Sequence, residues 1–125
     1  MTVQGVLDDL IAEQQALDDV VSSLSPQQWA EATPSPGWNV ADQIAHLTYF
    51  DATAALAIRD TFAFIEHRDH LAGLMSDPAA VERETMDPLR ALTGDGLLSE
   101  WRANRRALEA AGRTLAEDAR VEWYG

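Results

Sequence analysis

The chain has 125 residues and a formal net charge of −12, which arises from 21 acidic residues against nine arginines and no lysine. This balance disfavours nucleic acids and anionic membrane surfaces as partners, because both require clustered cations. The absence of cysteine excludes disulfides, thiolate zinc sites and cysteine nucleophiles. No apolar run approaches the roughly 20 residues of a membrane span. We therefore expect one cytoplasmic domain over residues 1–125.

The first 30 residues predict a long helix followed by a short one. Apolar residues recur every three or four positions from Val3 to Leu24, which is the pattern of a helix with one buried stripe. Ser25 and Pro26 then predict a new helical start, because serine caps helices and proline suits the first helical position. A short helical turn carrying Trp29 is expected to follow.

Residues 33–37 cannot form regular structure, because two prolines and a glycine remove hydrogen-bond donors and favour bends. After them, Asn39 is a good helix N-cap, and Asp42 lies in the first turn, where the helix dipole favours an acid. The second long helix is expected to bury one stripe centred on Leu47. The stripe comprises Val40, Ile44, Leu47, Phe50, Ala54 and Ile58.

The remaining residues predict a further helix from residue 60 to about Met75 and a short helical piece from Asp77-Pro78. A last long helix is expected near Gly96 to Leu115, and residues 121–125 are apolar and aromatic but not typical of a helix. Three long amphipathic helices with short helical pieces predict an all-α bundle. A regular four-helix bundle would require one more long helix after Gly125.

The chain has no serine-hydrolase elbow, phosphate-binding glycine loop or dinucleotide fingerprint. Its three histidines are the candidate metal ligands. His46 flanks the expected stripe of the second helix and is placed to point into a groove between helices. The alternative is a half-exposed histidine bonded to nearby backbone. His67 and His70 share a helix face, and such a pair binds zinc or nickel or simply lies on a solvated face.

A motif within residues 24–47 indicates a family. It consists of Trp29, a short gap, Pro36-Gly37-Trp38, a polar cap, a valine, an acid and then His46-Leu47. This pattern resembles the N-terminal metal-binding domain of mycothiol-dependent maleylpyruvate isomerases, within the DinB-like superfamily of four-helix bundles. The resemblance extends over the whole chain, including Asp51 and the closing residues 121–125.

The resemblance implies a DinB-like bundle that holds a divalent metal, namely zinc, nickel or iron, through three inward-facing side chains. His46 matches the first of these ligands. The family's other two ligands, a glutamate or histidine and a histidine four residues later, come from a fourth helix. The resemblance further implies a low-molecular-weight thiol such as mycothiol, activated by the metal for an isomerase or transferase reaction. His67 and His70 do not match the family's ligand positions.

The chain departs from this family pattern because it contains neither a fourth helix nor a second metal motif. The fourth helix is therefore expected to be missing or supplied by another chain, and catalytic and cofactor-binding residues stay unassigned. One hypothesis is the metal-binding domain of a thiol-dependent transferase or isomerase that also meets a small-molecule substrate. The other is a non-catalytic helical module that acts through partner binding or self-association as a homo-oligomer, because three amphipathic helices leave an apolar groove uncovered.

Overall fold

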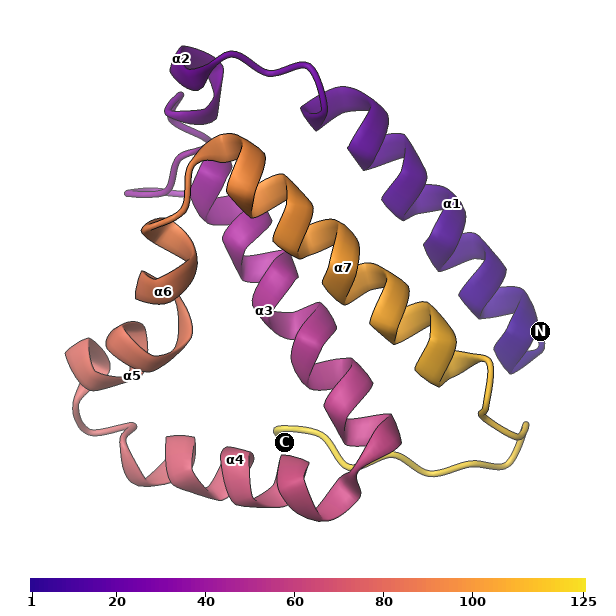
Figure 1. The fold of residues 1–125 in the computed structure, drawn as a ribbon. Coiled ribbons are helices and arrows are strands. Elements are labelled where there is room, and N and C mark those ends of the chain that lie inside the picture. Colours follow the sequence, from indigo (N-terminus) through magenta and orange to yellow (C-terminus); the bar gives the residue numbers. More distant parts are fainter.

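The computed structural model describes residues 1–125 and is built from helices and connecting loops (Figure 1). The predicted all-α class is confirmed, and none of the helices combines the length and apolarity that crossing a membrane requires. In chain order the helices are α1 (Val3–Val21), α2 (Pro26–Trp29), α3 (Val40–Arg59), α4 (Thr61–Gly73), α5 (Pro78–Thr85), α6 (Asp87–Arg90) and α7 (Gly94–Gly112).

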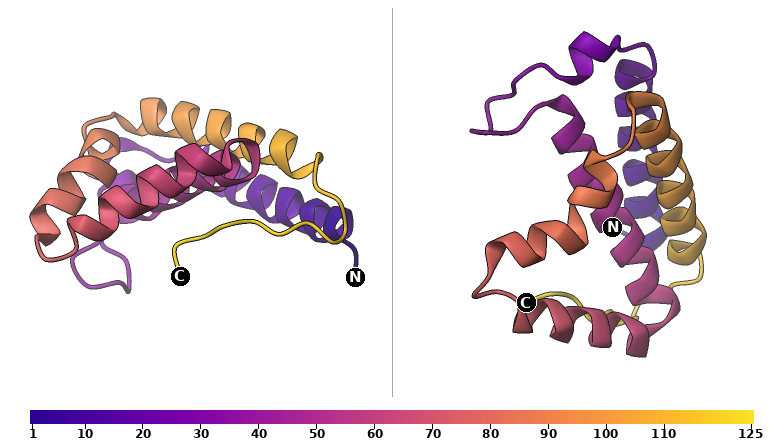
Figure 2. Two further views of the ribbon diagram at one scale, coloured as in Figure 1. Left: turned by 90° about the horizontal axis from the view of Figure 1, so that it is seen from below. Right: turned by 60° about the vertical axis from the view of Figure 1, so that its left-hand side comes forward.

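The three long helices pack side by side, and α7 contacts both α3 and α1 (Figure 1). Helices α4, α5 and α6 connect the end of α3 to the start of α7 (Figure 1). They lie on the side of α3 that faces away from α1. The tail after α7, residues 113–125, crosses past α3 and ends beside α4 (Figure 2). The tail and α4 therefore lie together although they are about 50 residues apart in sequence.

The predicted helix starts are confirmed by their caps. At α2, Ser25 accepts a hydrogen bond from the Gln28 amide, and the Gln28 side chain accepts one from the Ser25 amide. At α3, Asn39 and Asp42 form the same reciprocal pair at 2.8 and 3.0 Å. These reciprocal capping boxes provide hydrogen-bond partners for backbone amides that have none inside the helix. Helix α1 ends three residues before its predicted end, and the short helix α6 was not predicted.

The loop before α3 places Trp38. Gly37 has a φ of 78°, which side-chain-bearing residues rarely adopt, so the glycine permits the turn. The Thr33 amide donates to the Trp38 carbonyl at 3.0 Å, and Ala32 and Asn39 form an isolated antiparallel bridge. These contacts fix the Trp38 ring next to the first turns of α3.

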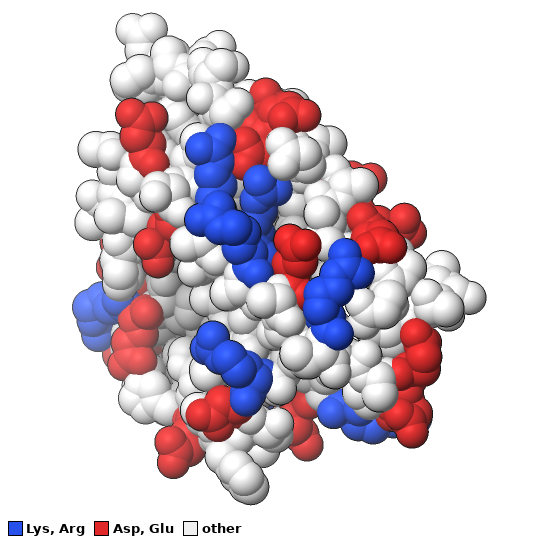
Figure 3. Space-filling model, turned by 45° about the vertical axis from the view of Figure 1, so that its right-hand side comes forward, with Lys and Arg blue, Asp and Glu red and all other residues white.

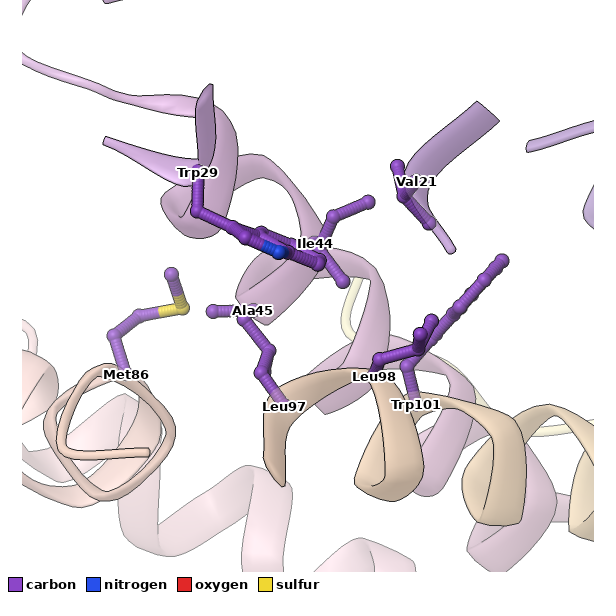
Figure 4. Close-up of a cluster of buried hydrophobic side chains, with 8 residues drawn as sticks. All are labelled: Val21, Trp29, Ile44, Ala45, Met86, Leu97, Leu98 and Trp101. Atoms are coloured by element: carbon purple, nitrogen blue, oxygen red, sulfur yellow. The ribbon is translucent and has the colours of Figure 1, made fainter. Parts of the chain in front are cut away.

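The core lies where α2, the start of α3 and the start of α7 meet the end of α1 (Figure 4). Trp101 is 1% exposed and is the largest fully buried side chain. The eight residues of the cluster are Val21, Trp29, Ile44, Ala45, Met86, Leu97, Leu98 and Trp101. This cluster holds the cap of α3 and the start of α7 against each other.

The predicted stripe of α3 was wrong at its centre, because Leu47 is 38% exposed. The face of α3 that packs on α7 instead contains the small residues Ala45, Thr48 and Ala55. Small side chains let two helix backbones approach closely, and the Thr48 hydroxyl is satisfied by the Ile44 carbonyl at 2.6 Å. A prediction that ranks residues by hydrophobicity misses this face of α3, because its residues are buried for their small size.

Candidate functional site

A cavity of about 440 Å³ lies between α3, α4 and α5, and the C-terminal tail borders it. Its wall is mainly apolar and aromatic, with contributions from Trp38, Phe50, Leu71, Met86 and Tyr124. Polar side chains also line it, among them His46, Tyr49, Arg68, Glu82 and Thr85. A concave apolar site with a few polar groups is the usual form of a small-molecule site in proteins.

His46 lies in this cavity with aromatic rings on both sides. Its ring centroid is 5.4 Å from that of Trp38 and 4.7 Å from that of Phe50. The residue is half-buried. The other two histidines are paired with protein side chains, whereas His46 forms no hydrogen bond within the chain. Its nitrogens therefore remain available to a ligand in the cavity.

Tyr49 contributes a hydroxyl that is tied into a chain of polar groups. Its oxygen lies 2.5 Å from His67 Nε2 and 3.3 Å from the hydroxyl of Tyr124. Burial raises the pKa of Tyr49 above its ordinary value and lowers the pKa of His67, so both groups are neutral at pH 7. In the tautomer with the proton on Nδ1, His67 Nε2 accepts the Tyr49 proton.

Arg68 fastens the tail to α4. Its Nη1 donates to the Glu122 carboxylate at 3.0 Å and to the Trp123 carbonyl at 3.2 Å, and its Nε donates to Asp69 at 3.3 Å. Trp123 stacks on Phe64 with centroids 5.6 Å apart and an interplanar angle of 8°. The tail thereby brings Tyr124 to the cavity and to Tyr49.

The structure does not bring His67 and His70 together as a metal-binding pair. His67 faces Tyr49 on α3, whereas His70 Nε2 lies 2.7 Å from Glu84 on α5. Sequence reasoning missed Tyr49 and Tyr124 as site residues. The three-residue spacing between His46 and Tyr49 on one helix was a signal for the first. No sequence signal placed Tyr124, because its position depends on the path of the tail.

With this geometry in place, comparison with known proteins decides the family. The family model of the mycothiol maleylpyruvate isomerase N-terminal domain matches residues 10–125. The chain belongs to this family. The match includes α3 with His46 and all the elements that line the cavity. The resemblance inferred from the sequence motif is thus confirmed.

Two curated relatives of this domain family are uncharacterized proteins of Mycobacterium tuberculosis, from strains CDC 1551 and H37Rv. Each is 32% identical over 117 residues, which cover 94% of this chain but 44% of the relative. The chain thus spans less than half the length of these relatives. No solved structure matches the chain significantly.

The metal that the family implies is not matched by a complete set of ligands in this domain. No three side chains among histidine, cysteine, aspartate and glutamate lie close enough together to hold a metal ion. One imidazole alone binds a divalent cation weakly, because structural and catalytic sites use at least three protein ligands. His46 therefore does not form a metal site with the other residues of 1–125.

Proposed function

We propose that the chain acts as the helical N-terminal domain of a thiol-dependent isomerase or transferase, in which His46 supplies one ligand to a divalent cation. The cation, zinc, nickel or iron, takes its other ligands from outside residues 1–125. The cavity beside His46 receives the small-molecule substrate, and a low-molecular-weight thiol is the co-substrate. The family match supports this reaction class.

The observation that carries the proposal is the position of His46. The imidazole is the one histidine of the chain that lies in the cavity without a protein hydrogen-bond partner. Trp38 and Phe50 pack against its ring and restrict its orientation. A histidine kept only for packing would be expected to bond a neighbouring group.

The expected result of removing this imidazole is the loss of bound metal. The protein, expressed as its complete reading frame and purified without a histidine tag, should contain about one zinc, nickel or iron ion per site by mass spectrometry. His46→Ala should reduce that content at least tenfold, because loss of one of three ligands removes most of the affinity. His46→Gln, which preserves more of the packing, should behave in the same way.

His70→Ala is the matched control, since His70 is exposed and faces Glu84. This variant should retain the metal content of the wild type. Circular dichroism of each variant checks that the helices remain. Wild-type protein without any bound cation, or a His46 variant that keeps it, would contradict the proposed metal ligand.

A second candidate function, self-association, is favoured by an apolar groove between α1 and α3. The groove is lined by Leu10, Leu17 and Leu47, with Trp101 at its base. Leu10 and Leu47 are each 38% exposed. Because these apolar side chains are accessible along the groove, a second copy of the chain is the proposed occupant.

The groove also contains a carboxyl group whose titration makes this association depend on pH. Burial raises the pKa of Asp51 to about 6, against the opposing hydrogen bonds of Trp101 and Gln14 and the charge of Arg105. Covering the groove removes more water from Asp51 and so favours its protonated form. We therefore expect association to be tighter at pH 5 than at pH 8.

Sedimentation velocity at both pH values tests this expectation at concentrations of about 10–100 µM. Leu47→Glu should weaken the association, and Phe62→Glu is the control because Phe62 is exposed on α4, away from the groove. A monomer at every concentration and pH would rule out self-association through this surface.

A further inference from the structure

We propose that a hollow between the end of α1 and α7 binds a phosphate group, either inorganic phosphate or a phosphomonoester, through Arg102 and Arg106. The hollow has a volume of about 500 Å³. It shares no lining residue with the cavity that contains His46, so the inference is independent of the proposed function. The lining residues are Ser22, Asp95, Leu98, Ser99, Arg102 and Arg106.

Most of this lining comes from one polar face of α7. Polar residues recur on it at spacings of four, three and four positions, which is the pattern of a single helix face. They are Asp95, Ser99, Arg102 and Arg106. Ser22, the C-cap of α1, adds a hydroxyl from the neighbouring helix. The hollow is therefore polar, although α7 also contributes to the core.

The two arginines give the hollow an excess of positive charge, in a chain whose net charge is −12. Arg102 and Arg105 both pair with Asp18 on α1, so one carboxylate serves two guanidinium groups. Arg106 is the one arginine of α7 that forms no ion pair. Arginine side chains gather on the face that α1 and α7 form (Figure 3). Since Arg106 lies one helical turn from Arg102, the two cations repel each other, and an anion between them removes that repulsion.

The hydrogen-bond donors that stay unused favour a phosphate over a carboxylate. Arg102 donates to Asp18 through Nε and Nη2, so its Nη1 has no partner within the chain. The guanidinium of Arg106 and the hydroxyls of Ser22 and Ser99 also have none. A phosphate carries about two negative charges and three terminal oxygens, which match two guanidinium groups and two hydroxyls. A carboxylate carries one charge and is satisfied by a single arginine fork.

Asp95 determines where in the hollow the anion lies. It precedes Arg102 by seven positions and Arg106 by eleven, which corresponds to about 10 and 16 Å along the helix axis. The phosphate is therefore expected between the two arginines, away from Asp95. At that separation the carboxylate weakens the binding of an anion without preventing it.

Inorganic phosphate and glycerol 3-phosphate are the probes that test this site. Binding is followed by ¹H–¹⁵N correlation spectra of protein freed of divalent cations, with the Nε–Hε signals of Arg102 and Arg106 as reporters. We expect both probes to bind with a Kd of about 1 mM or below at low salt, and acetate at least tenfold more weakly. Added sodium chloride should weaken the binding. Tighter binding of glycerol 3-phosphate would assign the hollow to a phosphomonoester, and equal binding would assign it to inorganic phosphate.

Three variants localise the binding. Arg106→Ala should weaken it about tenfold, as the loss of a charge-assisted hydrogen bond predicts. This variant should fold, because Arg106 is exposed and forms no ion pair. Arg83→Ala is the matched control, since it removes the same charge from an exposed position of α5, and it should leave the affinity unchanged. Asp95→Asn should strengthen the binding about two- to threefold.

Three results would overturn the phosphate site. The first is the absence of binding by both phosphates, and the second is an equal affinity for acetate. The third is an equal loss in Arg106→Ala and Arg83→Ala, which would show that overall charge, and not this hollow, attracts the anion. Because the protein is freed of divalent cations, none of these results depends on a metal at His46.

Discussion

Replacing Trp101 by alanine is expected to lower the free energy of unfolding by about 3–5 kcal/mol, the usual cost of removing a buried aromatic side chain. Trp101 is 1% exposed within the main core cluster. The Arg105 guanidinium lies 4.9 Å from the centre of its ring, so the substitution also removes a cation–π contact. Since domains of this size have about 5–15 kcal/mol of stability, the variant is expected to lose a large part of it.

Urea denaturation followed by far-ultraviolet circular dichroism measures this loss. Trp123→Ala is the matched control, because Trp123 is 41% exposed and one face of its ring stacks on Phe64 outside the main core cluster. Its expected cost is about 1 kcal/mol. Equal losses for the two variants would show that the packing around Trp101 does not dominate the stability of the domain.

Features of the fold that depend on neighbouring residues could be predicted from the sequence. The reciprocal cap of Asn39 and Asp42 and the Ser25-Pro26 start of α2 are local chemistry, and both appear as expected. The bends at residues 33–37 also follow directly from proline and glycine. The family motif belongs to the same class, because its tryptophans and His46 lie within about 20 residues of one another.

Features that depend on distant residues could not be predicted in this way. The buried face of α3 contains Thr48 rather than Leu47, because α7 selects small residues at the crossing. The contact of Tyr49 with His67 joins two helices, and Tyr124 reaches it because Arg68 and Phe64 hold the tail. The sequence thus indicated His46 as a candidate site residue but not the groups that surround it in the cavity.

Replacing Asp18 by alanine is the second substitution expected to have a large effect, lowering the free energy of unfolding by about 2–4 kcal/mol. The carboxylate is 4% exposed and accepts three hydrogen bonds. Arg102 donates two of them, at 2.8 and 2.7 Å, and Arg105 donates one at 2.7 Å. These bonds join α1 to α7, on a face where arginine and acidic side chains intermingle (Figure 3). Without Asp18, Arg105 remains partly buried and unpaired.

The dependence of this contribution on pH distinguishes the ion pair from simple packing. The hydrogen bond from Arg102 holds the pKa of Asp18 below its ordinary value. The unfolded chain therefore binds the proton first as pH falls, so the stabilisation is complete above the unfolded pKa of about 4 and is lost as pH falls through the lower folded pKa. Asp18→Asn should consequently be less stable than the wild type in urea at pH 7, and the difference should shrink towards pH 2–3.

Asp9→Asn, at an exposed position of α1, should show little difference at either pH. A deficit in Asp18→Asn that did not change between pH 7 and pH 3 would mean that shape, and not charge, joins α1 to α7.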